Sequence, residues 1–415
     1  MARITCAPVC PGGNCPAIIA RMIWVISMLG GRRCSGNCAA PSARRVSRRL
    51  KPDELAARAF LLVWLFWLLP AEAQTLRYLG QQILPHGYTF RGTDVGGLSG
   101  LDYDPASRRF VAISDDRSRR QPARFYLLRL DLARFNTGAA PGHAGVELLD
   151  MTYLRDEAER LYEPRAVDPE AVRFGLAPDS LWWASEGDAR RGIPPAITEV
   201  GASGTAWRSL DVPAHVLPGK KRGVRDNLAF ESLALDRAAG RLYVGTENAL
   251  QQDGPEADVG QPSPARILAF ELASGKLLAE YVYIVEAVPQ APPLPLMFRT
   301  NGLVELLAGE GMLLALERAY VQGVGNSVRI YRLDLEDATD VSGIASLAGA
   351  TFQPVRKTLL LDLGTLGVRL DNLEGMSWGP RTAAGRPSLV LVADDNFSPL
   401  QETQFLAFEM ADRAD

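Results

Sequence analysis

Acidic side chains recur at fixed places along this chain, and carboxylates brought together can bind a metal ion and activate water. Four leading polar residues are each followed, sixteen positions later, by a carboxylate: Ser99 and Asp115, Glu170 and Glu186, Glu231 and Glu247, and Asn301 and Glu317. A fifth pair, Glu374 and Asp394, has a longer spacing. The candidate chemistry therefore repeats along the chain.

Short strands must position these residues. In the clearest copy, residues 230–236 and 241–246 alternate as two strands joined by a tight polar turn, and Glu247 follows the second strand. Several short strands at a period of roughly 70 residues are typical of a β-propeller, whose blades bury their faces by stacking. We predict an all-β propeller with five blades, or six if a long connection hides a degenerate blade.

The two ends of the repeat region complement each other. The last repeat supplies only three strands, and residues 76–84 form a strand with no partner in their own repeat. Closed propellers commonly complete the last blade with the N-terminal strand, which leaves no open sheet edge. We therefore predict that residues 76–84 pair with residues 405–408.

The repeated carboxylates are expected to form two rings around one mouth of the central channel. A hard cation with six to eight oxygen ligands would relieve their repulsion, and Ca²⁺ is the expected cofactor. The candidate ligands are Glu170, Glu186, Glu231, Glu247, Glu317, Asp115 and Asp394. Glu231 and Glu374 are the residues expected to hold the metal or orient water. Alternatively, each carboxylate only caps a turn or pairs with an arginine such as Arg318.

Two basic loops lie beside these carboxylates in the sequence. Arg117 and Arg119 in the first loop and Lys221 in the second are the expected ligands of an anionic substrate. The alternative is that they are solvated surface charges. The three histidines lie in different loops, and the only G-x-S-x-G string, at residues 375–379, falls within a predicted strand. Hydrolysis by metal-activated water is therefore favoured over a serine nucleophile.

The N-terminal part differs from the rest. Residues 53–73 combine a basic flank, an apolar run too short to span a bilayer and an A-x-A site, which predicts a signal peptide cleaved after Ala73. We expect a periplasmic or secreted protein without stable membrane insertion after cleavage. Residues 1–52 hold all five cysteines and are interpreted as a mis-assigned upstream start or a disordered segment, although a zinc site is conceivable. Residues 74–415 are expected to form one domain.

Charge narrows the range of partners. The whole chain has 45 basic and 48 acidic residues, and removal of residues 1–73 leaves 35 basic and 45 acidic ones. This surplus of carboxylates argues against a nucleic-acid-binding surface. The part from residue 74 on has no cysteine and must rely on its core, for which its length is ample. We expect a monomer acting on a small anionic or ester substrate.

Several motifs resemble those of a known family. They are residues 226–234 (DNLAFESLA), the loop at 251–255, residues 266–268, residues 371–376 (DNLEGM) and residues 394–405 (DDNFSPLQETQF). Together they resemble the bacterial "esterase-like activity of phytase" family over essentially all of the chain from residue 74. The resemblance implies export and a β-propeller, with Glu231, Glu374, Asp394, Asp395 and Asn396 at family-motif positions.

Taken together, the residues and the resemblance lead us to expect a Ca²⁺-dependent hydrolase of phosphoester or carboxylic ester bonds. The family name refers to calcium-dependent propeller phytases, which use calcium-bound water and basic side chains. The main alternative is a non-catalytic propeller that binds a ligand or a protein in the periplasm. A third alternative is a lactonase-like enzyme with a channel cation.

Overall fold

The computed structural model describes residues 74–138 and 140–412. The segment predicted as a mis-assigned start (residues 1–52) and the predicted signal peptide (residues 53–73) lie outside the described residues. Among the residues that are described, there is no helix with the length and apolar character needed to cross a bilayer.

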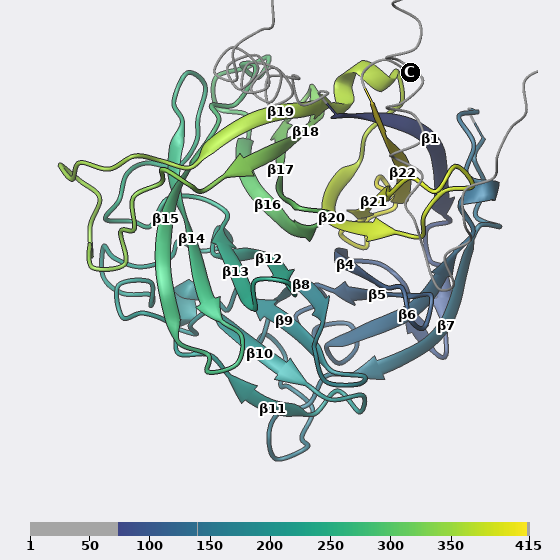
Figure 1. Cartoon of the computed structure of the whole chain (residues 1–415), viewed down its shortest axis with the longest axis horizontal. Coiled ribbons are helices and arrows are strands. Elements are labelled where there is room, and N and C mark those ends of the chain that lie inside the picture. The colour runs from purple at the N-terminus through teal and green to yellow at the C-terminus, as the bar shows by residue number, and fades with distance from the viewer. Residues whose placement is uncertain (1–73, 139, 413–415) are drawn as a thin grey trace, which may run out of the picture. The chain divides into compact units, whose positions relative to one another are not determined.

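Five four-stranded antiparallel sheets follow one another around a ring, which confirms the five-bladed propeller (Figure 1). Blade 1 consists of β4 (Leu98–Asp104), β5 (Arg109–Ser114), β6 (Arg124–Leu130) and β7 (Val146–Tyr153). Blade 2 consists of β8 (Pro169–Phe174), β9 (Leu181–Ser185), β10 (Ala196–Val200) and β11 (Ala206–Ser209). Blade 3 consists of β12 (Phe230–Asp236), β13 (Arg241–Thr246), β14 (Ser263–Glu271) and β15 (Leu277–Val285).

The remaining blades complete the ring. Blade 4 consists of β16 (Arg299–Gly309), β17 (Met312–Val321), β18 (Gly325–Asp334) and β19 (Arg356–Asp362). Blade 5 consists of β20 (Asn372–Gly379), β21 (Ser388–Asp394), β22 (Thr403–Asp412) and β1 (Gln74–Leu84). The connections add a two-stranded hairpin and three short 3₁₀ helices: β2 (Thr89–Phe90), β3 (Thr93–Asp94), η1 (Leu132–Arg134), η2 (Ala189–Arg191) and η3 (Leu363–Leu366).

The N-terminal strand closes the ring as predicted. β1 pairs antiparallel with β22, with Tyr78 opposite Phe408 and Gln82 opposite Phe405. The innermost strands β4, β8, β12, β16 and β20 contact one another in succession, and β20 returns to β4. Because the last blade combines both ends of the chain, the ring is held shut by backbone hydrogen bonds.

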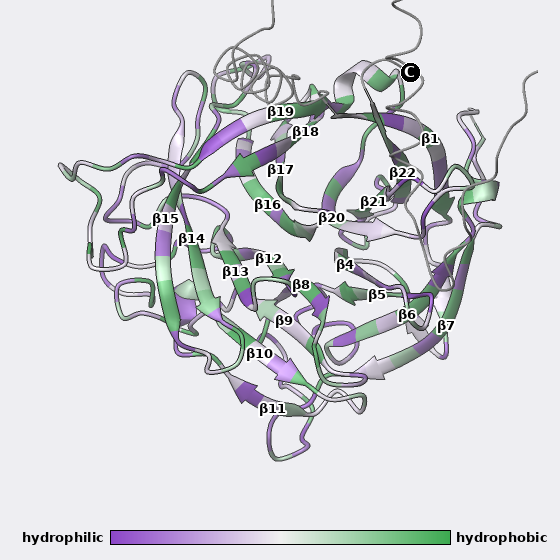
Figure 2. Cartoon of the chain, viewed as in Figure 1, coloured by the Kyte–Doolittle hydropathy of each residue, from purple (hydrophilic) through white to green (hydrophobic). Residues whose placement is uncertain are grey.

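The hydrophobic core lies between blades. Each of the five large clusters of buried apolar side chains draws its members from two neighbouring blades. Between blades 2 and 3, for example, Trp182 packs in one cluster with Phe230 and Leu233. Figure 2 shows hydrophobic residues along the strands of all the blades. No blade can bury its faces alone, so the stability of each depends on its neighbours.

A buried ion pair crosses the channel. Arg173 of β8 contacts Glu305 of β16 at 2.8 Å, and both side chains are almost fully buried. The Arg173 guanidinium also donates to the carbonyls of Leu101 and Leu306, while Glu305 accepts from the amide of Leu233. The pair therefore links the innermost strands of four blades.

Ring closure can be tested at Leu84, which is 1% exposed and packs between blade 5 and blade 1. Leu84→Ala should lower the free energy of unfolding by about 2–5 kcal/mol, because it removes buried methyl groups and leaves a cavity. Urea denaturation measures this change. The control Leu176→Ala, at a residue that is 58% exposed, should change the free energy of unfolding by less than about 0.5 kcal/mol. Equal effects of the two substitutions would contradict the packing described here.

Candidate functional site

The leading residues of four repeats are β-bulges. In each innermost strand the pairing register with the next strand shifts by one residue, at Ser99, Glu170, Glu231 and Glu374. A bulged residue leaves the pairing ladder, and its side chain is re-aimed, which is why bulges are frequent beside active sites. We call these four residues the inner ring. Three of its members are buried glutamates.

The second strand of each blade returns to the same mouth. In blades 1 to 3 its last paired residue lies opposite the residue before the bulge, as Thr246 lies opposite Phe230, and in blade 5 the pairing extends one residue further, to Asp394. The residue at the end of this second strand, or the one that follows it, belongs to a second set of side chains at the mouth, which we call the outer ring. Its acidic members are Asp115, Glu186, Glu247 and Asp394.

Blade 4 departs from the predicted alignment. The bulge of β16 falls at Val304, not at Asn301, and Leu303 lies opposite Glu317. The residue equivalent to Glu247 is therefore Arg318, and the expected place of Glu317 in the outer ring is wrong by one position. The reason is that the β16–β17 hairpin is longer than its counterparts, so equal spacing in the sequence does not mean equal position in the blade.

Glu317 instead lies in a separate buried network between blades 3 and 4. Its carboxylate contacts the Lys357 ammonium at 2.6 Å and accepts hydrogen bonds from the Tyr283 hydroxyl (2.7 Å) and the Asn301 amide (2.9 Å). These donors leave little capacity for a cation. Glu317 is also absent from the described residues that line the cavity at the mouth.

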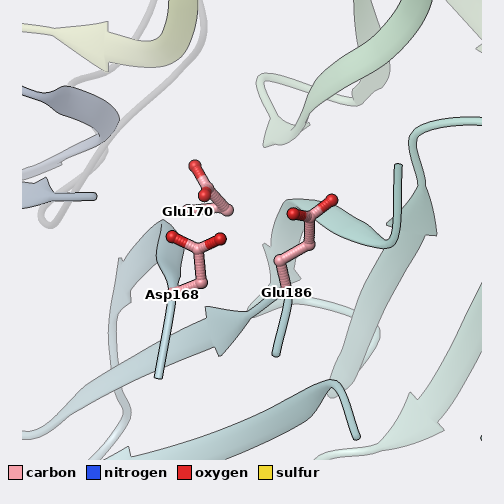
Figure 3. Close-up of side chains that lie close together, drawn as sticks. All are labelled: Asp168, Glu170 and Glu186. Atoms are coloured by element: carbon pink, nitrogen blue, oxygen red, sulfur yellow. The ribbon is translucent and has the colours of Figure 1, made fainter. Parts of the chain in front are cut away.

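Two groups of carboxylates at the mouth have oxygen atoms within 4.8 Å of one another: Asp168, Glu170 and Glu186, and Glu186, Glu231 and Glu247. Glu186 belongs to both groups. In the first group, Asp168 lies just before β8, Glu170 is the second residue of β8, and Glu186 follows the end of β9 (Figure 3). The structure therefore unites four of the seven predicted metal ligands in two overlapping triads.

Asp168 was missed by sequence reasoning. It is fully buried, and its Oδ1 atom has no hydrogen-bond partner among the described residues. It lies two positions before the bulge residue Glu170, just as Asn372 lies two positions before Glu374. A polar residue two positions before the bulge in two repeats is the sequence feature that could have identified Asp168.

Burial and mutual repulsion raise the pKa values of the carboxyl groups at the mouth. Burial raises the pKa of Glu231 well above its ordinary value, and the carboxylates of Glu186 and Glu247 raise it further. Burial raises the pKa of Glu247 to about 7, although Arg318 opposes the shift. Burial likewise raises the pKa of Asp168 to about 6 against the effect of Arg117. The same cause raises the pKa values of Asp115, Glu170, Glu186 and Asp394.

Two arginines partly neutralise these carboxylates. Arg117 contacts Asp168 at 2.7 Å and donates to the side-chain oxygen of Asn227 at 2.6 Å. Arg318 contacts Glu374 at 2.5 Å. Burial alone would lower the pKa of Arg318, but the neighbouring carboxylates, Glu374 foremost, raise it overall. Both guanidinium groups are therefore fixed as cations at the mouth.

Of the three predicted substrate ligands, Arg117, Arg119 and Lys221, only Arg117 is among the described residues that line the cavity at the mouth. A cavity of about 1110 Å³ at the mouth is lined by Arg117, Glu231 and Glu374 among others. Arg119 and Lys221 are exposed and are not among its described lining residues. No histidine lies among those residues either, and Ser377 is fully buried in β20.

The closing motif of the chain borders the mouth. Asp394 accepts a hydrogen bond from the amide of Asn396 at 2.6 Å, and Asp395 accepts one from the amide of Gly97 at 2.9 Å. The ring of Phe397 lies beneath the Arg120 guanidinium, 4.8 Å from it. A Cβ at Gly97 would lie 2.7 Å from that ring and 2.1 Å from a carboxylate oxygen of the outer ring. The motif thus fixes blade 5 against blade 1.

These features define a class of protein, a five-bladed propeller with buried carboxylates at one mouth of its channel. The family model described as "Phytase-like: Esterase-like activity of phytase" matches residues 93–397, and the chain belongs to this family. The resemblance inferred from the sequence motifs is thereby confirmed. No curated protein matches the chain significantly.

Solved structures similar to the chain have low sequence identity. One is described as the structure of the Dos1 propeller (TM-score 0.34, 7% identity, 77% of this chain and 69% of that one). A second is a bifunctional GH43-CE protein of Bacteroides eggerthii (TM-score 0.41, 10% identity, 79% and 34%). A third is the major Malassezia sympodialis allergen Mala s 1 (TM-score 0.38, 8% identity, 76% and 93%). The fold assignment rests on the strand pairing and not on these matches.

The raised pKa values predict how the metal-free protein responds to pH. A carboxyl with a raised pKa in the folded state holds its proton more tightly there than in the unfolded chain. Its contribution is neutral below the ordinary pKa and becomes destabilising as pH rises toward the folded value, which is about 7 for Glu247. In EDTA, the melting temperature should therefore fall by several degrees between about pH 5 and about pH 8.

Glu247→Gln removes one of these charges without changing the shape of the side chain. In EDTA, this variant should melt higher than the wild type at about pH 8, and its melting temperature should depend less on pH. The matched control is Glu147→Gln, at a solvent-exposed ion pair with Arg129. It should keep the wild-type pH dependence. A Glu247→Gln protein that melts lower than the wild type at about pH 8 would contradict the described repulsion.

Proposed function

We propose that this protein is an exported, Ca²⁺-dependent hydrolase of ester bonds, with its reaction centre at the acidic mouth of the propeller. The observation that carries the proposal is the triad Glu186, Glu231 and Glu247, whose buried oxygen atoms lie within 4.8 Å of one another. Within the described residues, no protein donor is hydrogen-bonded to the carboxylate of Glu231 or Glu247. Buried, closely spaced carboxylates without hydrogen-bond donors favour the binding of a cation, which relieves their repulsion.

The chemistry of the ligands favours a hard cation. All the candidate ligands are carboxylate oxygens, which Ca²⁺ prefers, and the softer ligands histidine and cysteine are absent from the described lining of the cavity. The unpartnered Oδ1 atom of Asp168 adds a further oxygen to the same cluster. The raised pKa values of the triad mean that protons compete with a cation for these oxygens. Binding should therefore strengthen with rising pH.

In the proposed mechanism, the chain binds the cation and the substrate and orients water. A bound Ca²⁺ would polarise the carbonyl or phosphoryl oxygen of the substrate. Glu374 is held by the Arg318 guanidinium at 2.5 Å and by the side-chain amide of Asn372 at 3.0 Å. We propose that its carboxylate accepts the proton of the attacking water. We assign Arg117 the role of stabilising the substrate oxygen that gains negative charge. The water oxygen bonds to the acyl carbon or phosphorus, the ester bond breaks, and the proton passes to the leaving alcohol.

Export belongs to the same proposal. It is supported by the sequence of residues 53–73, which has the composition of a signal peptide with cleavage after Ala73. Outside the cytoplasm, calcium-binding modules operate with dissociation constants of about 0.1–1 mM. We also propose that the propeller works as a monomer on a small substrate.

The proposal predicts linked effects of Ca²⁺ on stability and turnover. A cation that binds only the folded protein at about 100 times its dissociation constant stabilises it by about 2.7 kcal/mol, so the melting temperature in Ca²⁺ should exceed that in EDTA by several degrees. Hydrolysis of p-nitrophenyl acetate or p-nitrophenyl phosphate should require Ca²⁺. Glu231→Gln should lose the thermal shift and at least about 90% of the turnover, whereas the control Glu147→Gln should keep both.

The outcomes separate the hydrolase from its rival. A Glu231→Gln protein with wild-type calcium response and wild-type turnover would contradict the assignment of the centre. A calcium-dependent thermal shift without hydrolysis of either ester would instead favour a binding propeller. That rival is supported by the burial of Ser377 and by the absence of histidine from the described cavity lining.

A further inference from the structure

The inner hairpin of blade 4 projects beyond the other blades at the acidic mouth. In β16, five residues, from Arg299 to Leu303, pair with β17 before the bulge. In β4, β8 and β12 only one residue precedes it, and in β20 two residues do. At about 3.3 Å per residue, the hairpin extends roughly 10 Å past its neighbours. It therefore forms a wall on one side of the cavity.

This wall is apolar where the rest of the mouth is charged. Phe298 is 61% exposed and its ring lies 6.2 Å from that of Tyr320, while Val324 in the following turn is 47% exposed. Phe298 is nevertheless fixed, because its amide donates to the Gln322 side chain and its carbonyl accepts from the Gln322 amide. Leu400, which is 80% exposed, comes from the closing motif of blade 5.

The apolar side chains and the acidic rings belong to one cavity. Phe298, Tyr320, Val324 and Leu400 line the same cavity of about 1110 Å³ as the ring carboxylates. Exposed apolar groups that are held in place beside a polar centre are typical of a small-molecule site, in which they bind the non-reacting part of the ligand. The cavity thus has an acidic floor and an apolar wall.

The charge of the cavity selects among ester classes. Besides most of the ring carboxylates, Asp371 lines the cavity, and the only basic residues among its described lining are Arg117, Arg318 and Arg369. With these carboxylates ionised, one divalent cation would leave the cavity net negative. A phosphomonoester carries up to about two negative charges near neutral pH and would be repelled. A neutral ester would not be.

We infer that the substrate is a neutral carboxylic ester with an apolar acyl group. Its acyl chain lies against Phe298 and Val324, and its ester group reaches the acidic floor near Glu231. This inference rests on the proposed hydrolase function and assigns its substrate class. Hydrolysis consumes one water and yields a carboxylic acid and an alcohol, so no further reactant is needed.

The experiment measures kcat/KM of the purified protein in Ca²⁺ on p-nitrophenyl acetate, butyrate and hexanoate and on p-nitrophenyl phosphate. A fully buried methylene raises kcat/KM about fourfold, and one that is half-buried against the wall about twofold. The four methylenes added from acetate to hexanoate should therefore raise kcat/KM about 16-fold. The phosphate should be the poorest substrate. Phe298→Ser should remove most of the gain with chain length, so that kcat/KM on hexanoate falls further than kcat/KM on acetate.

Leu294→Ser is the matched control, since Leu294 is 63% exposed in the segment before β16 and is not among the described lining residues. It should keep the chain-length gain. Phosphate preferred over every carboxylic ester, or a gain that survives Phe298→Ser, would overturn the substrate class while the hydrolase function stands. Failure to hydrolyse any of the four esters would overturn the hydrolase function, and the inference with it.

Discussion

The mutual repulsion of carboxylates crowded into one mouth of the channel is the constraint on which this site depends. Five innermost strands converge there, and in three of them a bulge turns a glutamate out of the ladder toward the same space. Burial then penalises the charge of each group, and its neighbours add to the penalty. Such an arrangement lowers stability unless something compensates for it.

The structure supplies compensation in two forms. Arg318 replaces a carboxylate in the outer ring and pairs with Glu374, while Arg117 reaches Asp168 from a loop. Below the mouth, the Arg173–Glu305 pair ties four innermost strands together, so the carboxylates cannot move apart by opening the ring. Repulsion within a rigid frame is a means of preorganising a cation site, because the ligands are already assembled.

Much of the fold was predictable from the sequence. The strand repeats, the number of blades and the closure by β1 follow from alternating hydrophobicity and from a missing fourth strand, which are local properties. Membership of the phytase-like family was also predictable, because its motifs are specific. Four inner-ring residues were found because bulges recur at the same place in their repeats.

The remainder of the site depends on features that spacing does not encode. The long hairpin of blade 4 moves the bulge to Val304 and places Arg318 where Glu317 was expected. The burial of Asp168 results from packing between segments, and the solvent-exposed positions of Arg119 and Lys221 result from the paths of two loops. Sequence reasoning identifies residue types near strand ends, but register and loop path decide which of them meet.

The most direct test of the central claim is a crystal structure of the protein grown in Ca²⁺, with an anomalous difference map recorded at long wavelength. The account predicts a peak bounded by Glu186, Glu231 and Glu247, with oxygen distances of about 2.3–2.6 Å. Peaks only at contacts between molecules, with the three carboxylates unliganded at the mouth, would contradict it.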